Sequence, residues 1–297
     1  MEKAIHIYQR SKGGVILFYT LQDYLLYYSV FSVYAKRHGI VVLGLALMYD
    51  HLHCLAVANK RQEVEPMMSA VSSVFARLYN AEAGLSGELF QRPFGSAVKL
   101  GSKNIRTAAG YLYNNHTNKK LCDSADKVRW NFLAYAVTPN PFSKKIVIRN
   151  ASVKMRNALK EVAYCQTKGL HLHYPQIDRM FNCLSSLEKE QLTDYIVHTY
   201  SRLDYRYMID YYGSYDNMLY AFRTNSGSEY DLNEEKHFGS DAIYGKMKDV
   251  VHETGAVGKI KDIISLSDRE KTRLAALIRA RTGADNWHLS RFLWKAF

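Results

Sequence analysis

Two histidines separated by one residue, His51 and His53, are the strongest candidates for chemistry in this sequence. The apolar, β-branched run over 40–48 predicts a buried strand, and 51–58 predicts the strand that returns beside it. Because side chains alternate along a strand, both imidazoles should point to one face while Leu52 points into the core. Two imidazoles on one face offer two ligands to a divalent ion, so we expect a metal site here.

A second pair with the same spacing, His171 and His173, lies between a Lys-Gly and a Tyr-Pro dipeptide. These dipeptides predict a loop or the lead-in to a helix. A loop gives no rigid scaffold to hold two rings on one ion, so this pair is the weaker metal candidate.

A tyrosine and an asparagine four residues apart, Tyr111 and Asn115, are the next candidates. The segment 103–114 predicts a helix, and residues i and i+4 lie on one helical face. If the helix extends through Asn115, the phenol and the amide oxygen reach the same small volume. Tyrosine is a poor nucleophile at its ordinary pKa of about 10, but a divalent ion that polarises a phosphodiester makes attack easier. Tyr113 is a rival, and either ring could simply pack in the core.

Five segments follow one another in the order of motifs from a known family: 6–14, 47–55, 87–96, 111–115 and 129–135. Together they resemble the single-tyrosine HUH transposases, which include the insertion-sequence-200-like and REP-associated tyrosine transposases. The segment 47–55 is similar to the family's "vMpNHvHll" motif. The segment 111–115 is similar to its "YIhlN" motif, in which the first tyrosine is the nucleophile.

The rest of the chain resembles Bacteroides-type members of this family that carry a helical C-terminal extension. That resemblance rests on 214–219, 227–231 and 291–293, and it supplies no chemistry. Within the motifs, Tyr49 and Asp50 stand where the family usually has Pro and Asn, and His116 replaces a Pro. Asp50 therefore adds a negative charge beside the histidine pair.

The resemblance implies an α+β fold, with an antiparallel-sheet HUH (ferredoxin/RRM-like) nuclease domain followed by an all-helical region. It also implies that His51 and His53 bind Mg²⁺ or Mn²⁺ with Asn115 as the third protein ligand. Tyr111 would attack a phosphate of single-stranded DNA near a hairpin, giving a 5′-phosphotyrosine and a free 3′-hydroxyl that can later rejoin the strand. The chain would be a bacterial, cytoplasmic, nucleoid-associated transposase of a mobile element, acting as a monomer or a homodimer.

The net charge of +12 favours a polyanionic partner, with nucleic acid ahead of an acidic membrane. Net charges of +10 over 1–150, −3 over 151–258 and +5 over 259–297 place most of the excess around the motifs. Eight basic residues flank the motif segments as candidate phosphate contacts: Arg10, Lys12, Arg92, Lys99, Lys103, Arg106, Lys119 and Lys120. We expect no signal peptide, no membrane span and no disulfides.

The predicted elements place these residues in three regions. Residues 1–150 read as a βαββαβα domain with an antiparallel sheet, and 151–258 as a helical middle domain. Residues 259–297 predict two basic helices, 267–281 and 285–295, which are either a helix-turn-helix for duplex DNA or a hairpin packed on the middle domain. The basic and histidine side chains around that pair are Arg279, Arg281, His288, Arg291 and Lys295.

Two other functions remain open at this stage. An HUH relaxase or replication-initiator nickase would use the same chemistry, but those groups more often place the histidine pair after the tyrosine or use two tyrosines. A domesticated, non-catalytic hairpin-binding regulator would keep the fold and lose the cleavage, which the intact set of His51, His53, Tyr111 and Asn115 disfavours.

Overall fold

A four-stranded antiparallel sheet lies at the centre of the computed structural model, which describes residues 2–91, 93–224 and 240–297. Its strands are β1 (Lys3–Arg10), β2 (Val42–Leu47), β3 (His51–Ala56) and β4 (Gly95–Leu100), in the order β2-β3-β1-β4. The α+β prediction with an antiparallel sheet is confirmed. β4 lies at one edge of the sheet, and β2 lies at the other.

The register of β1 against β3 decides which side chains meet. Tyr8 pairs with His53 and Arg10 with His51. Strand alternation places these residues and His6 on one face of the sheet. The opposite face carries apolar side chains such as Ile7 and enters the larger hydrophobic core.

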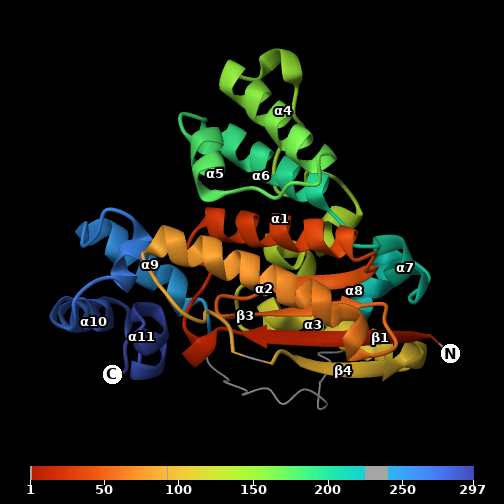
Figure 1. Cartoon of the computed structure of the whole chain (residues 1–297), viewed down its shortest axis with the longest axis horizontal. Helices are drawn as coiled ribbons and strands as arrows, with labels where there is room; N and C mark the ends of the chain where they lie inside the picture. Colours follow the sequence, from red (N-terminus) through yellow and green to blue (C-terminus); the bar gives the residue numbers. More distant parts are fainter. Residues whose placement is uncertain (1, 92, 225–239) are drawn as a thin grey trace.

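Helices α1 (Leu21–Arg37) and α2 (Arg61–Ala83) cover the apolar face of the sheet (Figure 1). α1 begins after Thr20, because the Thr20 hydroxyl accepts from the Asp23 amide and the Asp23 carboxylate accepts from the Thr20 amide. This capping box satisfies amides that would otherwise have no partner at the helix start.

The histidine face of the sheet is covered by α3 (Gly101–Asn118). α3 is longer than the predicted 103–114, so it includes Asn115 as the site prediction required. Beside it lie α7 (Tyr205–Asp210) and α8 (Tyr215–Thr224). Gly213, with φ of +77°, separates them, because a left-handed residue cannot continue a right-handed helix.

Past residue 150 the described chain is helical, as expected. α4 (Val153–Thr167), α5 (Tyr174–Phe181) and α6 (Ser186–Tyr200) stand on the side of α1 away from the sheet (Figure 1). α9 (Ile243–Thr254) leads toward the C-terminal helices. The resemblance segment 227–231 lies outside the described residues.

The two predicted C-terminal helices are α10 (Asp268–Thr282) and α11 (Asn286–Leu293), and a capping box of Ser267 and Glu270 begins α10. α11 packs on the loop before α1. The Tyr19 hydroxyl donates to the Phe292 carbonyl at 2.5 Å, and the Trp294 indole donates to the Ile16 carbonyl at 3.1 Å. Binding of this helix pair to duplex DNA stays a prediction.

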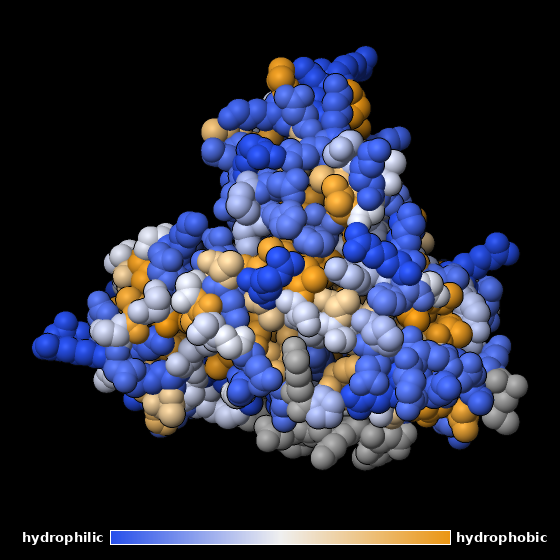
Figure 2. Space-filling view, viewed as in Figure 1, coloured by the Kyte–Doolittle hydropathy of each residue, from blue (hydrophilic) through white to orange (hydrophobic). Residues whose placement is uncertain are grey.

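One hydrophobic core joins the three sequence regions. Phe31 of α1, Leu192 of α6, Val250 of α9 and Phe292 of α11 belong to the same buried cluster. The boundaries at 150 and 258 therefore run through shared packing, and a division into three domains stays a prediction. The face in Figure 2 is mostly hydrophilic, with hydrophobic residues in small groups. No helix in the described part of the chain combines the length and apolar character of a membrane span.

The buried carboxylate of Asp23 holds segments from all three regions together. It accepts from the Tyr19 amide at 3.1 Å, the Thr20 amide at 2.8 Å and the Tyr174 hydroxyl at 2.6 Å. It also forms an ion pair at 2.6 Å with Lys261, which lies in the short 3₁₀ helix η6 (Ile260–Ile264). Asp23 is fully buried, so no water can replace a lost partner.

We expect Asp23→Asn to lower the free energy of unfolding by about 3–5 kcal/mol, because the buried Lys261 ammonium loses its counter-charge. Chemical denaturation measures the effect. The matched control is Asp178→Asn, an exposed carboxylate on α5 whose side-chain partner is Gln22, and it should cost less than about 1 kcal/mol. Equal effects of the two substitutions would contradict the role given to Asp23.

Candidate active site

The two histidines of the β3 motif lie side by side and buried on the sheet face that α3 covers. The ring centroids of His51 and His53 are 5.2 Å apart, and both residues are at most 2% exposed. The Tyr8 ring packs at 5.5 Å from His51 and 5.2 Å from His53. The geometry expected from strand alternation is therefore present.

Tyr111 reaches this pair from α3 of the same chain. Its ring centroid lies 5.4 Å from that of His53 and 5.9 Å from that of His6. Asn115, one turn later and also buried, donates from Nδ2 to the Tyr111 carbonyl at 3.0 Å. The i, i+4 spacing thus places both side chains on the helix face that lies over the sheet.

Two further histidines belong to the site, and sequence reasoning gave neither a role in it. His6 on β1 lies within hydrogen-bond distance of His53, with Nε2 and Nδ1 3.2 Å apart. His116 donates from Nε2 to the Leu47 carbonyl at 3.1 Å, which fastens α3 to the end of β2. His6 lies two residues before Tyr8, so the sequence indicates that both side chains point to one face of a strand. Only the β1–β3 register shows that this face places His6 beside His53.

Burial sets the protonation of these rings. It lowers the pKa of His53 well below its usual range, with the charges on His51 and His6 acting in the same direction. It also lowers the pKa of His116 to about 4. Both rings are therefore neutral at pH 7, the state in which imidazole binds a metal.

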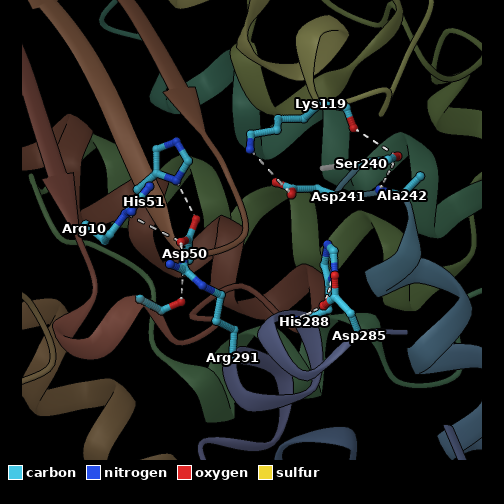
Figure 3. A network of polar contacts seen from close by, with 11 residues as sticks. Arg10, Asp50, His51, Lys119, Ser240, Asp241, Ala242, Asp285, His288 and Arg291 are labelled. Carbon is cyan, nitrogen blue, oxygen red and sulfur yellow. Dashed lines mark hydrogen bonds and ion pairs between the residues drawn. The ribbon is translucent and has the colours of Figure 1, made fainter. Parts of the chain in front are cut away.

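The carboxylate of Asp50, in the turn before β3, lies among several charged and polar groups of the site (Figure 3). Its Oδ1 lies 2.5 Å from Nδ1 of His51, and its Oδ2 lies 2.5 Å from Nη1 of Arg291 and 3.6 Å from Nε of Arg10. Burial alone would raise the pKa of Asp50, but His51 and the two guanidinium groups outweigh it and hold the pKa at about 2. Asp50 is thus a carboxylate at any pH near neutrality.

The donor set fits a hard divalent ion. Within the described ranges, no three His, Cys, Asp or Glu side chains come together as a metal site. An amide oxygen is a further type of ligand that such ions accept, and Asn115 lies on the same side of α3 as Tyr111. Two imidazoles and one amide oxygen leave positions for water and phosphate oxygens, which Mg²⁺ and Mn²⁺ accept.

The eight basic candidates fall into different environments. Four are exposed: Lys12, Lys103, Arg106 and Lys120. Three are buried or half-buried: Arg10 in the Asp50 ion pair, Lys99 on β4 at 5% exposure, and Lys119 with Nζ 4.0 Å from Asp241. Arg92 lies outside the described residues.

Comparison with protein families gives the identity of the segment that holds this site. Residues 15–115 match the family model of IS200-like transposases. This segment belongs to the IS200-like transposase family. The transposase segment contains His51, His53, Tyr111 and Asn115, and DNA binding and DNA transposition are the activities of its family. The helices past residue 115 lie outside the match.

Other comparisons cover the whole chain. No curated protein matches it. The solved structure of a REP-associated tyrosine transposase bound to a REP hairpin is similar to it with a TM-score of 0.39 and 12% identity, over 51% of this chain and 91% of that one.

Tyr113, the other candidate nucleophile in this segment, is packed in the core and hydrogen-bonded. It is 1% exposed, its ring stacks on Phe222 at 5.3 Å, and its hydroxyl donates to the Leu43 carbonyl at 3.1 Å. Burial raises the pKa of Tyr113 far above its ordinary value. A buried, bonded phenol of this kind supports the junction of α3 with β2.

We expect Tyr113→Phe to lower the free energy of unfolding by about 1–2 kcal/mol, because the Leu43 carbonyl loses its side-chain donor. Denaturant titration measures the loss. Tyr220→Phe on α8, where the ring is 69% exposed, is the matched control and should leave stability unchanged. A neutral Tyr113→Phe would show that the hydroxyl has no part in holding α3.

Proposed function

We propose that this chain is a metal-dependent transposase that cleaves hairpin-associated single-stranded DNA with Tyr111 and rejoins the strands. The observation that carries the proposal is the contact of the Tyr111 ring with His53 across the α3–sheet interface of one chain. A nucleophile and a metal-ligand pair within one buried contact are what phosphodiester transfer requires.

In this proposal His51, His53 and Asn115 hold Mg²⁺ or Mn²⁺. The bound ion would neutralise charge on the scissile phosphate and orient it. The Tyr111 hydroxyl loses its proton as its oxygen forms a bond to phosphorus. The bond from phosphorus to the 3′ oxygen breaks, and that oxygen takes up a proton, so the strand leaves with a 3′-hydroxyl. The tyrosyl phosphodiester keeps the bond energy, so a 3′-hydroxyl can attack it later and restore a DNA strand.

The contact between Tyr111 and the histidines within one chain favours a complete site in a monomer. A homodimer that exchanges its tyrosine helices would instead leave the two groups of one chain apart. Because α3 is bound to β2 through His116 and Tyr113, the helix that carries Tyr111 is held on its own sheet.

The exposed basic side chains of α3 offer a path for the strand. Lys103 and Arg106 line a pocket of about 270 Å³ together with Tyr212 and Phe222. Cationic side chains next to aromatic rings are the combination that holds phosphates and unstacked bases of single strands. We propose this pocket as part of the DNA surface.

The nucleophile is tested with a hairpin-bearing single-stranded oligonucleotide in the presence of Mn²⁺. The wild-type chain should become covalently attached to the 5′ end of the product, visible as a shift on a denaturing gel. Tyr111→Phe should give no adduct, because no phenol oxygen remains at that position. Tyr113→Phe is the matched control, two residues along the same helix, and should keep the adduct.

Two outcomes would contradict this assignment. An adduct formed by Tyr111→Phe would move the nucleophile elsewhere. Tight hairpin binding by the wild-type chain with neither cleavage nor adduct would favour the non-catalytic regulator.

Metal binding is tested by titration calorimetry with Mn²⁺ on the full chain. We expect His51→Ala and His53→Ala each to weaken Mn²⁺ affinity by about 100-fold or more, since each removes a ligand. The matched control is His171→Ala, in the second His-Leu-His pair, where the rings lie 4.6 Å apart in a loop between α4 and α5. Equal losses at His171 and His53 would contradict a metal site on β3.

A further inference from the structure

Arg291, a residue of the last helix, penetrates the candidate active site. α11 projects its guanidinium toward the turn before β3 (Figure 3), where Nη1 lies 2.5 Å from Oδ2 of Asp50 and 2.9 Å from the Gly14 carbonyl. The Trp287 ring stacks on the same guanidinium at 3.9 Å. Arg291 is only 9% exposed, so it faces the site and not the solvent.

The guanidinium of Arg291 fits against the backbone because residue 14 is a glycine. A Cβ on Gly14 would lie 2.5–2.8 Å from the guanidinium atoms of Arg291, closer than carbon atoms can approach. Gly14 also has φ of +68°, which favours glycine. The loop from 14 to 19 is then held against α11 by the Arg291 carbonyl, which accepts from the Ile16 amide at 3.1 Å.

The carboxylate that Arg291 contacts determines which nitrogen of His51 carries a proton. An ionised carboxylate accepts hydrogen bonds and cannot donate one. The 2.5 Å contact of Asp50 Oδ1 with His51 therefore requires the proton on Nδ1. With the proton on Nδ1, the nitrogen that can offer a lone pair to a metal is Nε2, on the far side of the ring from Asp50.

We propose that Arg291 is a positioning residue that holds the Asp50 carboxylate against His51 and so prepares His51 Nε2 as the metal ligand. This inference rests on the proposed function, because it assumes that His51 binds the ion. Metal-binding histidines commonly donate their other ring N–H to a carboxylate, and loss of such a partner weakens metal affinity about 10- to 100-fold. Here the partner is itself fixed by a helix that lies 241 residues further along the chain.

A second guanidinium lies near the same carboxylate. Arg10 Nε is 3.6 Å from the Asp50 oxygen that Arg291 Nη1 contacts at 2.5 Å.

The test is a double-mutant cycle on the full chain, read as Mn²⁺ affinity by calorimetry. Arg291→Gln should weaken Mn²⁺ binding about 10-fold. In an Asp50→Asn background the same substitution should change affinity by no more than about two-fold, because its partner charge is already gone. Arg179→Gln is the matched control: it removes an arginine–carboxylate bond of the same 2.5 Å length, to Glu161, far along the chain on α5.

A second readout needs no metal. Histidine ¹⁵N spectra of the metal-free wild type at pH 8 should show His51 protonated at Nδ1, and Arg291→Gln should shift that tautomer population toward Nε2–H. If Arg291→Gln does not fold, Arg291→Lys is the alternative variant. It keeps the positive charge and the aliphatic stem beside Trp287 but loses the planar set of guanidinium N–H donors. Its tautomer population should change in the same direction.

Different results would contradict the proposed function and the positioning role of Arg291. A wild-type chain that binds no Mn²⁺ would overturn the proposed function and the inference with it. A wild-type chain that binds Mn²⁺ with the same affinity as Arg291→Gln, or a cycle in which the two substitutions simply add, would overturn the inference alone.

Discussion

The packing of α3 on the histidine face of the sheet is the constraint on which the rest of this site depends. Small and apolar side chains of the helix, Ala109 and Leu112 among them, fit against Ala46 and Leu55 of the strands. Close approach is possible because Gly44 has no side chain; a Cβ there would lie 3.2 Å from the Tyr113 hydroxyl. A larger side chain at this position of β2 would push α3 away from the sheet and move Tyr111 away from His51 and His53.

Hydrogen bonds at the edges of this interface fix the rotation of α3 about its own axis as well as its distance from the sheet. His116 bonds the end of β2, and Asn114 donates to the Phe222 carbonyl of α8 at 2.8 Å. Because a helix turns by about 100° per residue, only one rotation lets Tyr111 and Asn115 face the sheet. These contacts select that rotation, and they come from residues next to the site that do no chemistry themselves.

Periodicity was sufficient to predict the parts of the site that lie within one element. Alternation on β3 placed His51 and His53 on one face, and helical spacing placed Tyr111 with Asn115. The break at Gly213 and the burial of Lys99 were not predicted, because each depends on packing between elements. The same holds for His6, which needs the β1–β3 register, and for Arg291, whose partner is more than 200 residues away.

The contact between α11 and the turn before β3 joins residues that are 241 positions apart, so it can form only late in synthesis of the chain. A ribosome produces Asp50 and the rest of the transposase segment long before it produces Arg291. A chain still in synthesis, or one cut short before α11, has the histidines and the tyrosine but lacks the guanidinium that fixes Asp50. The contact between Asp50 and Arg291 can therefore form only in a chain that has been translated through α11.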